Sequence, residues 1–377
     1  MTGEMLSPEK VIWINARFLT RPVTGVERVA REVISALVRH HLDSQGCWRG
    51  SGQVLRFGLI APRTPEALSN PWPELRLWQT GVFQGHAWEQ WDLPRCTAGR
   101  LLLNFCNTAP LFKRHQWTFL HDAQTFAIPQ NFTLALRWWY RLMFWMVARW
   151  GLGVLTNSRF SASELARFMR VDRSRLTVAH LGADHMERVT PDLTPRLKTL
   201  MDLLADRPFV LAVSSDNPNK NFSSVIKALE LMGPHAPACV IVGQKNDRVF
   251  SRSTLSTEKI HHLGYVTDAE LVTLYRRATV MAYPSFYEGF GLPPLEAMWH
   301  GCPVVVSRTS ALPEISADAA LYCDPNDPAS LAAALSSLVH DPVLRLQMSR
   351  RGQDRARTFV WRQTATVILE AVTAPCR

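Results

Sequence analysis

The feature that most restricts the fold of this chain is a regular alternation of short apolar segments with longer amphipathic ones. The short apolar segments are typical of buried strands, and the amphipathic ones are typical of helices that cover a sheet. Strands that alternate with helices form parallel sheets covered on both faces, so the chain is expected to be an α/β protein. The expected strands are 11–14, 56–60, 101–105, 117–120 and 152–155 in a first series, and 209–213, 239–242, 279–282 and 303–306 in a second.

The two series of strands predict two domains. A chain of 377 residues with 47% apolar content is long enough to bury two cores. A polar, proline-containing segment around residues 190–207 separates the series and is the expected linker. We therefore expect one domain over residues 1–195 and another from residue 196. Ligands of such folds bind at the carboxyl ends of the strands.

A glycine-rich turn enclosed by two carboxylates is the segment that says most about function. Seven residues separate Glu288 from Glu296, and the turn leads into an expected helix. Gly289 and Gly291 allow the backbone to approach a ligand, and the N-terminus of a helix favours a phosphate or an oxyanion. Carboxylates beside such a place can accept hydrogen bonds from sugar hydroxyls. The alternative is that Glu296 only complements the helix dipole while Glu288 is solvated.

The segment 288–296 resembles the E-x7-E motif of glycosyltransferase family 4, a large family of retaining enzymes. Other stretches resemble the same family in the same order, so the resemblance covers nearly the whole chain. It implies the GT-B fold, in which two doubly wound, Rossmann-like domains face each other across a cleft and a C-terminal helix crosses back to the first domain. The domains would be an acceptor-side domain (1–195), a donor-binding domain (196–356) and the crossing helix (357–377). The other matching stretches are 18–32, 118–122, 155–158, 210–214, 219–221, 263–268, 310–314 and 359–361.

The resemblance also implies roles for individual residues. Lys220 would attract the diphosphate as it gains charge, and this attraction would grow in the transition state. His121 resembles the acceptor-side histidine near the reacting carbon, with Asp122 orienting its ring, although a His–Asp pair is also common in turns and caps. Glu288 would contact the donor sugar and Glu296 the ribose. The implied catalytic residues are His121, Glu288 and Lys220, and the implied donor-binding residues are Gly25, Asn219, Lys220, Tyr265, Val266, Glu288, Gly289, Phe290, Gly291 and Glu296.

One position departs from the family pattern. The family usually has an arginine directly before the Lys-Asn pair, whereas this chain has Asn219, preceded by Pro218. Lys245 is a candidate for the missing cation. No Asp-x-Asp sequence occurs, and that spacing resembles the metal-holding motif of the other common glycosyltransferase fold. We therefore expect a reaction that needs no metal and no cofactor besides the donor substrate.

Positive charge is concentrated in the first half of the chain. Residues 1–190 hold 23 Lys and Arg against 14 Asp and Glu, whereas the whole chain has a net charge of +10. Such a surface can meet nucleic acid, an anionic membrane or a phosphorylated acceptor, or can simply keep the protein soluble. On one side of a helix over 137–150, Arg137, Arg141 and Arg149 would lie with Trp138 and Trp145. This arrangement favours either a membrane interface or a buried helix.

Other sequence features bear on location. The seven cysteines form no C-x-x-C pair and are expected to be reduced thiols. No apolar run is long enough to span a bilayer, and residues 1–10 lack the apolar core of a secretory signal, so we expect a cytoplasmic protein.

The resemblance predicts a retaining, metal-independent glycosyltransferase that passes a hexose, with mannose favoured, from a nucleotide diphosphate sugar to a glycan acceptor. The opening at 18–25 resembles enzymes that assemble O-antigen, capsule or exopolysaccharide chains, so we expect a lipid-linked acceptor and peripheral contact with the inner face of the membrane. Nucleic acid is not an expected partner. Two alternatives stay open: a nucleotide-sugar epimerase of the same fold, and a non-enzymatic basic protein that binds nucleic acid or membrane. A dehydrogenase is disfavoured because no G-x-G-x-x-G follows a strand.

Overall fold

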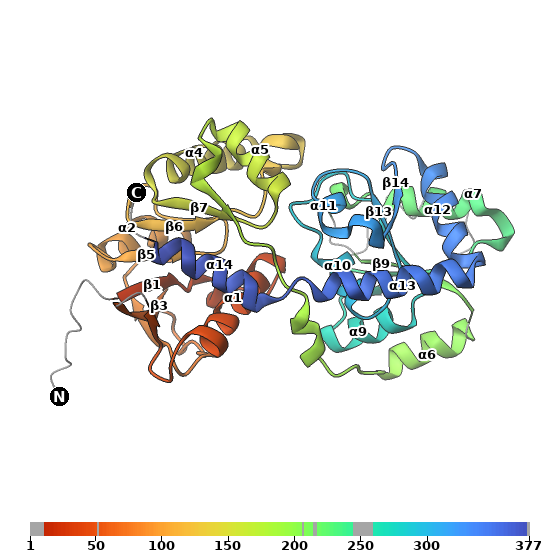
Figure 1. Cartoon of the computed structure of the whole chain (residues 1–377), viewed down its shortest axis with the longest axis horizontal. Coiled ribbons are helices and arrows are strands. Elements are labelled where there is room, and N and C mark those ends of the chain that lie inside the picture. The colour runs from red at the N-terminus through yellow and green to blue at the C-terminus, as the bar shows by residue number, and fades with distance from the viewer. Residues whose placement is uncertain (1–10, 51–52, 206, 214–216, 244–258, 375–377) are drawn as a thin grey trace. The chain divides into compact units, whose positions relative to one another are not determined.

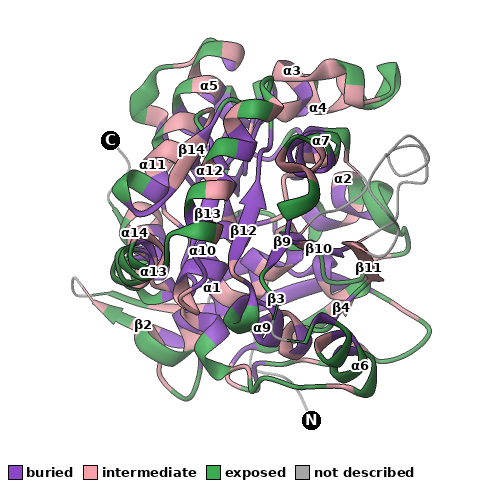
Figure 2. Cartoon of the chain, turned by 90° about the vertical axis from the view of Figure 1, so that its right-hand side faces the viewer, coloured by how far each residue is buried: buried purple, intermediate pink, exposed green. Residues whose placement is uncertain are grey.

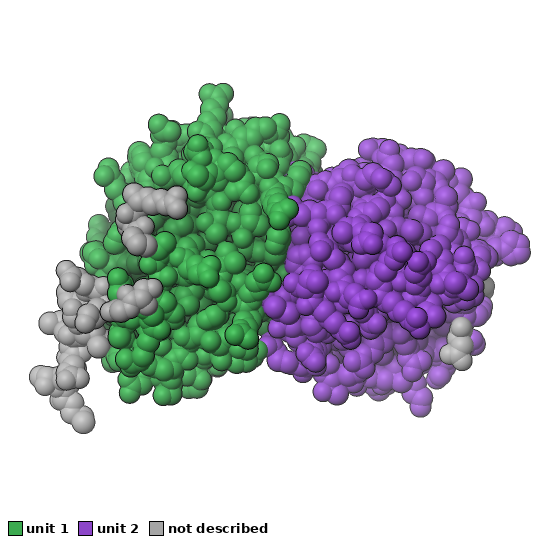
Figure 3. Space-filling view, in the orientation of Figure 1, with its two compact units in different colours: residues 1–181, 361–377 green, residues 182–360 purple. Residues whose placement is uncertain are grey.

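The computed structural model describes residues 11–50, 53–205, 207–213, 217–243 and 259–374 (Figure 1). They fall into two compact units, the first made of residues 1–181 and 361–377 and the second of residues 182–360 (Figure 3). Each unit contains one largely parallel sheet with helices packed on it.

The limits of the units differ from the predicted domain limits at residues 195 and 356. The segment after residue 181 bonds to the second unit, since the Ala183 amide donates to the Phe359 carbonyl (3.0 Å) and the Asp192 amide donates to the Ala269 carbonyl (3.1 Å). The chain therefore leaves the first unit before the polar segment that the sequence marked as the linker.

The sheet of unit 1 has the strand order β2-β3-β1-β5-β6-β7-β8, with β4 also paired to β3. All of its described pairings are parallel except that between β2 and β3. Every residue of β1 and β7 is buried, as expected of central strands covered on both faces. The strands are β1 (Val11–Asn15), β2 (Cys47–Gly50), β3 (Gln53–Pro62), β4 (Arg76–Thr80), β5 (Leu101–Asn104), β6 (Gln116–Phe119), β7 (Gly153–Thr156) and β8 (Leu176–Val178).

The last helix of the chain, α14, packs against the first, α1, within unit 1. Trp361 and Ile368 of α14 are buried, and Thr366 Oγ1 lies 3.1 Å from His41 Nε2 at the end of α1. The prediction that the C-terminal helix returns to the first domain is therefore confirmed, although the helix begins at Trp361, after α13 ends at Arg357 and a short connection follows. The α-helices of unit 1 are α1 (Gly25–His41), α2 (Gly85–Cys96), α3 (Gln124–Ala127), α4 (Leu134–Trp150), α5 (Arg159–Met169) and α14 (Trp361–Thr373), and its 3₁₀ helices are η2 (Arg17–Thr20), η3 (Pro129–Asn131) and η4 (Arg173–Arg175).

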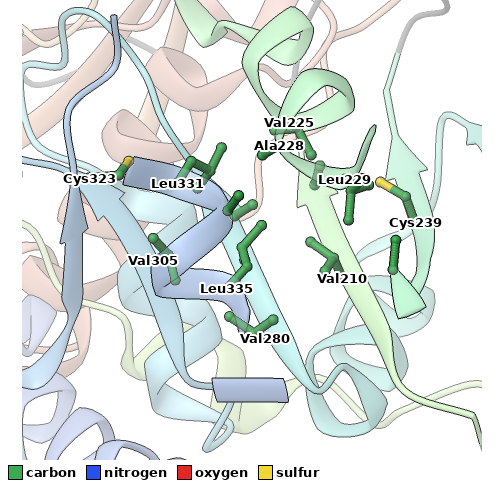
Figure 4. Close-up of a cluster of buried hydrophobic side chains, with 14 of the residues drawn as sticks. Val210, Val225, Ala228, Leu229, Cys239, Val280, Val305, Cys323, Leu331 and Leu335 are labelled. Carbon is green, nitrogen blue, oxygen red and sulfur yellow. The ribbon is translucent and has the colours of Figure 1, made fainter. Parts of the chain in front are cut away.

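The sheet of unit 2 has the order β11-β10-β9-β12-β13-β14, and its described pairings are all parallel. Strands β12 and β13 are fully buried (Figure 2). Val210, Val280 and Val305 point from the sheet into a core that Leu229 of α7 and Leu335 of α12 complete (Figure 4). The strands are β9 (Phe209–Val213), β10 (Ala238–Val242), β11 (Ile260–Gly264), β12 (Val280–Tyr283), β13 (Val304–Ser307) and β14 (Leu321–Cys323).

Helices flank this second sheet, and the order of strands and helices is that of a doubly wound fold. The predicted GT-B class, with two Rossmann-like sheets and a returning C-terminal helix, is confirmed. The α-helices of unit 2 are α6 (Pro195–Leu204), α7 (Phe222–Met232), α9 (Asp268–Arg277), α10 (Leu292–Trp299), α11 (Leu312–Ser316), α12 (Pro328–His340) and α13 (Pro342–Arg357), and its 3₁₀ helices are η5 (Asp184–Arg188), η6 (Pro218–Lys220), η7 (Gly233–His235) and η9 (Ala317–Ala319).

Candidate active site

A lysine and a carboxylate meet at the carboxyl ends of two neighbouring strands of unit 2. Lys220 ends the short helix after β9, Glu288 lies in the loop after β12, and these strands pair in parallel. Lys220 Nζ donates to Glu288 Oε1 (2.7 Å) and to Tyr283 Oη (2.6 Å). Parallel strands bring their carboxyl ends to one edge of a sheet, which is why residues far apart in the chain are in contact.

The surroundings of Lys220 keep it charged. Burial alone disfavours the ammonium, but the charge of Glu288 and the hydrogen bonds from Lys220 to Glu288 and Tyr283 outweigh it and raise the pKa of Lys220. Burial also raises the pKa of Tyr283, so its hydroxyl stays neutral. An ammonium has three N–H donors, and the two contacts use two of them. The third can be directed at an anionic ligand.

The loop that carries Glu288 is fixed by the segment after β13. The Glu288 amide donates to Ser310 Oγ (2.9 Å), and the Ala311 amide donates to the Glu288 carbonyl (3.3 Å). These bonds hold the backbone of Glu288 while its side chain bonds to Lys220.

Gly291 shapes the start of α10. It is the N-cap residue and has a φ of 104°, in the region that favours glycine, and a Cβ there would lie 2.6 Å from Leu312 Cδ2. The first turn of α10 contains Pro293 and Pro294, which have no N–H. The helix start thus offers fewer donors than the sequence interpretation assumed, and anion binding there depends more on the loop that contains Gly289.

Glu296 is buried on α10, and both of its carboxylate oxygens have protein partners. Oε1 lies 3.1 Å from His185 Nε2, and Oε2 accepts a hydrogen bond from Tyr275 Oη (3.2 Å). Burial and the neighbouring carboxylate raise the pKa of Tyr275, so it remains a donor. Each carboxylate oxygen has two acceptor positions, which leaves capacity for hydroxyl groups of a ligand.

Asn219, which stands where the family usually has an arginine, binds the backbone. Its Nδ2 donates to the Tyr287 carbonyl, its amide donates to Asn217 Oδ1 (3.0 Å), and its own carbonyl accepts from the Phe286 amide (2.9 Å). It ties the turn after β9 to the loop after β12 and adds no charge. Lys245, the candidate for the missing cation, lies outside the described residues.

Three other predicted donor-binding residues differ widely in exposure. Phe290 is buried, and its ring lies edge-on to that of Phe359, with the ring centroids 5.9 Å apart. Tyr265 and Val266 follow β11 at the edge of the sheet, where Tyr265 is 82% exposed and Val266 is buried. A role near the donor base fits the exposed tyrosine better than the buried valine side chain.

In unit 1, His121 follows β6 and is buried and neutral. Its Nε2 lies 2.8 Å from the Phe105 carbonyl, which can only accept, so this nitrogen carries the proton. Burial lowers the pKa of His121 to about 4. Phe105 thus orients the ring through Nε2. Asp122 Oδ1 accepts from the Gln124 amide (2.9 Å), and its role in orienting the ring stays a prediction. Glu27, which lies in the same first turn of α1 as Gly25, is near enough to influence the pKa of His121.

A buried polar network lies at the ends of β1 and β5 in the same unit. Glu89 of α2 is fully buried and accepts hydrogen bonds from Asn15 Nδ2 and Thr108 Oγ1, both at 2.8 Å. Arg17 pairs with it at 3.1 Å. Burial alone would raise the pKa of Glu89, but the hydrogen bonds from His86 and these neighbours and the charge of Arg17 lower it. Sequence reasoning missed this network because its members are far apart in the chain.

Comparison with known families agrees with the resemblance of the motifs. Residues 202–355, most of unit 2, match the family described as glycosyl transferases group 1. The match covers less than half of the chain, and this part of the chain is similar to that family.

Curated relatives are similar to part of the chain, and solved structures share its fold. The chain is 34% identical over 228 residues to the O-antigen chain mannosyltransferase B of Escherichia coli, covering 58% of the chain and 59% of that relative. It is 27% identical over 248 residues to the O-antigen chain mannosyltransferase RfbU of Salmonella typhimurium, covering 64% of the chain and 66% of that relative. Among solved structures, Anabaena HepE in complex with UDP and glucose superposes with a TM-score of 0.73 at 16% identity, over 97% of this chain and 100% of that one.

Neither a metal cluster nor a spanning helix is found in the described part of this chain. No three His, Cys, Asp or Glu side chains among those residues are grouped so that they could hold a metal ion. In the same residues, no helix has the length and apolar character needed to cross a membrane.

Proposed function

We propose that the chain transfers a hexose, with mannose favoured, from a nucleotide diphosphate sugar to a glycan acceptor, with retention of anomeric configuration. The observation that carries the proposal is the contact of Lys220 with Glu288 at the carboxyl ends of β9 and β12. The similarity of residues 202–355 to the glycosyl transferases group 1 family and the names of the two O-antigen mannosyltransferase relatives support it.

In this proposal unit 2 binds the donor. The third N–H of Lys220 is directed at the diphosphate, and the attraction strengthens as the bond from the sugar C1 to the phosphate oxygen breaks. Glu288 accepts hydrogen bonds from sugar hydroxyls while it holds the ammonium in place, and Glu296 accepts from the ribose hydroxyls. Backbone N–H groups of Gly289, Phe290 and Gly291 contact the sugar and phosphate.

The acceptor hydroxyl attacks C1 from the face that the leaving group occupied. Its oxygen forms the new bond to C1, and its proton passes to an oxygen of the departing diphosphate. No side chain is then needed as a nucleophile, and no metal ion takes part. His121 is uncharged at neutral pH and contributes a polar, neutral wall near the reacting carbon.

We further propose that unit 1 receives a lipid-linked precursor of a surface polysaccharide at the inner face of the membrane. The names of the two O-antigen enzymes support this acceptor class. The polar groups around His121 and Gly25, and the positive charge of residues 1–190, suit an acceptor that carries hydroxyls and phosphate.

A thermal-shift screen tests the proposal, since a ligand that binds only the native state raises the melting temperature. The panel is GDP-mannose, UDP-glucose, UDP-N-acetylglucosamine, GDP, UDP, NAD and a short RNA, each with and without EDTA. We expect GDP-mannose to stabilise the protein equally in both conditions. A response to NAD or RNA alone would contradict the proposal, and a response that EDTA abolishes would contradict metal independence.

A further inference from the structure

Helix α4 presents a stripe of large apolar side chains to solvent. Leu134, Trp138, Leu142 and Trp145 are exposed by 68, 70, 48 and 42%, and their spacing of three or four residues puts them on one side of the helix. The opposite side, with residues such as Phe144, is buried in unit 1. The sequence left open either a membrane interface or a buried helix, and a fully buried helix is excluded by this exposed stripe.

A groove of about 600 Å³ runs beside the stripe. Apart from Arg141, it is lined by apolar and aromatic side chains from α3, α4 and α5, all within unit 1. Soluble proteins seldom leave so large a continuous apolar surface uncovered unless it binds something. Its lining includes Phe126, Trp138, Trp139, Leu142, Trp145 and Phe168.

Positive charge borders the apolar stripe. The helix carries Arg137, Arg141 and Arg149 and no Asp or Glu. Arg149 is exposed, and the Arg141 guanidinium lies over the Phe126 ring at 5.4 Å. On the neighbouring α5, the carboxylate of Glu164 forms an ion pair with the guanidinium of Arg167 (2.9 Å). The surface is apolar and rich in tryptophan, and its helix carries arginines but no acidic residue. Such a surface complements an anionic bilayer.

We propose that the α4 stripe and its groove dock onto the surface of an anionic lipid bilayer. The helix lies in the interface plane, the tryptophans enter the headgroup region, and Arg149 contacts lipid phosphates. Phe112, which is 79% exposed, extends the stripe, since its ring lies 6.4 Å from that of Trp150 at the end of α4. This docking rests on the proposed membrane-side acceptor and names the surface that makes the contact, and it does not depend on which donor is used.

Vesicle flotation of the purified full-length chain tests the docking. We expect binding to vesicles of phosphatidylglycerol and phosphatidylethanolamine and little binding to pure phosphatidylcholine. A triple variant, Trp138→Ser with Leu142→Ser and Trp145→Ser, should bind the anionic vesicles about tenfold or more weakly, because the apolar contact is lost. Trp91→Ser is the matched control, since Trp91 is also exposed, at 56%, but lies on α2. It should bind as the parent protein does.

The electrostatic contribution to bilayer binding is tested by a second variant with its own control. Arg149→Glu replaces an attraction to the bilayer with a repulsion and should weaken anionic binding about tenfold or more. Arg350→Glu makes the same charge change at an exposed position of unit 2 and should leave binding unchanged. All six altered residues are surface-exposed, so circular dichroism should show folded variants.

Three results would overturn the proposal. One is equal binding to anionic and zwitterionic vesicles, and another is unaltered binding of the triple variant. The third is a dimer in analytical ultracentrifugation that the triple variant converts to a monomer, because a second copy of the chain would then cover the stripe. Sugar-nucleotide binding does not enter these measurements, so failure here and failure of the proposed reaction can be told apart.

Discussion

Replacing Lys220 with methionine should reduce both stability and turnover, for two different reasons. The side chains of Lys220 and Glu288 keep 20% and 12% of their exposure, so the pair is mostly buried. Removing one partner from a fully buried pair costs about 3–5 kcal/mol, and the remaining solvent contact reduces this to about 2 kcal/mol. For a unit of this size that corresponds to a fall in melting temperature of about 4–8 °C. Loss of the cation from the leaving group should lower kcat about 10²–10³-fold.

The double variant Lys220→Met with Glu288→Gln separates these effects. It no longer leaves a carboxylate without its counter-ion, so we expect most of the lost stability to return. Turnover should stay low, because the charge that stabilises the leaving diphosphate is still missing. The assays are thermal unfolding and release of nucleoside diphosphate with saturating donor. A double variant that keeps more than about a tenth of the parental kcat would refute the assigned role, since removing one such group typically costs more.

Three further predictions concern other candidate residues. Glu296→Gln should weaken nucleotide binding about tenfold in calorimetric titration, because hydrogen bonds to a charged acceptor are the stronger ones; unchanged affinity would exclude the ribose contact. Gly291→Ala should lower the free energy of unfolding by about 2 kcal/mol or more, because Gly291 has a φ of 104° and the added Cβ would lie 2.6 Å from Leu312 Cδ2. Gly25→Ala is the control, since no atom lies within 4 Å of its added Cβ, and it should leave the free energy of unfolding nearly unchanged. Urea unfolding measures both. His121 has its pKa lowered from 6.5 to about 4 by burial, so the unfolded chain takes up a proton before the folded one, and stability should fall by about 2 kcal/mol between pH 7 and pH 5. In His121→Asn this part of the pH dependence should be absent, and an identical pH profile would show that the histidine is not neutral in the folded protein.

Local sequence patterns were sufficient for the strands that carry the site. The segments predicted at 209–213 and 279–282 fall on β9 and β12, because runs of buried β-branched and apolar residues identify central parallel strands. The E-x7-E motif likewise placed Glu288 in a loop and Glu296 on a helix. Short edge strands such as β2 and β14 were missed, because they have only four and three residues and are partly exposed, which is too short for a recognisable pattern.

Partners that come from distant parts of the chain could not be predicted. His185 is 111 residues from Glu296, and no local pattern in its 3₁₀ helix indicates the contact. Tyr283 gave a weak signal, because it directly follows the predicted strand 279–282 on the side where ligands bind, but its hydroxyl contact with Lys220 depends on the pairing of two strands.

The sequence also did not allow us to predict which side of α4 faces solvent. A helix with apolar residues on nearly every side fits both a core and an interface, and only the packing of Phe144 inward and Trp138 outward decides between them.

The central claim is retaining transfer from a nucleotide sugar, and proton NMR of the first-formed product tests it most directly. The donor selected by the thermal-shift screen is incubated with the protein and an alkyl mannoside or water as acceptor, with EDTA present. We predict that the first product has the anomeric configuration of the donor, and that the Lys220→Met and Glu288→Gln double variant forms almost none. A product of inverted configuration, or equal turnover by that variant, would contradict the account.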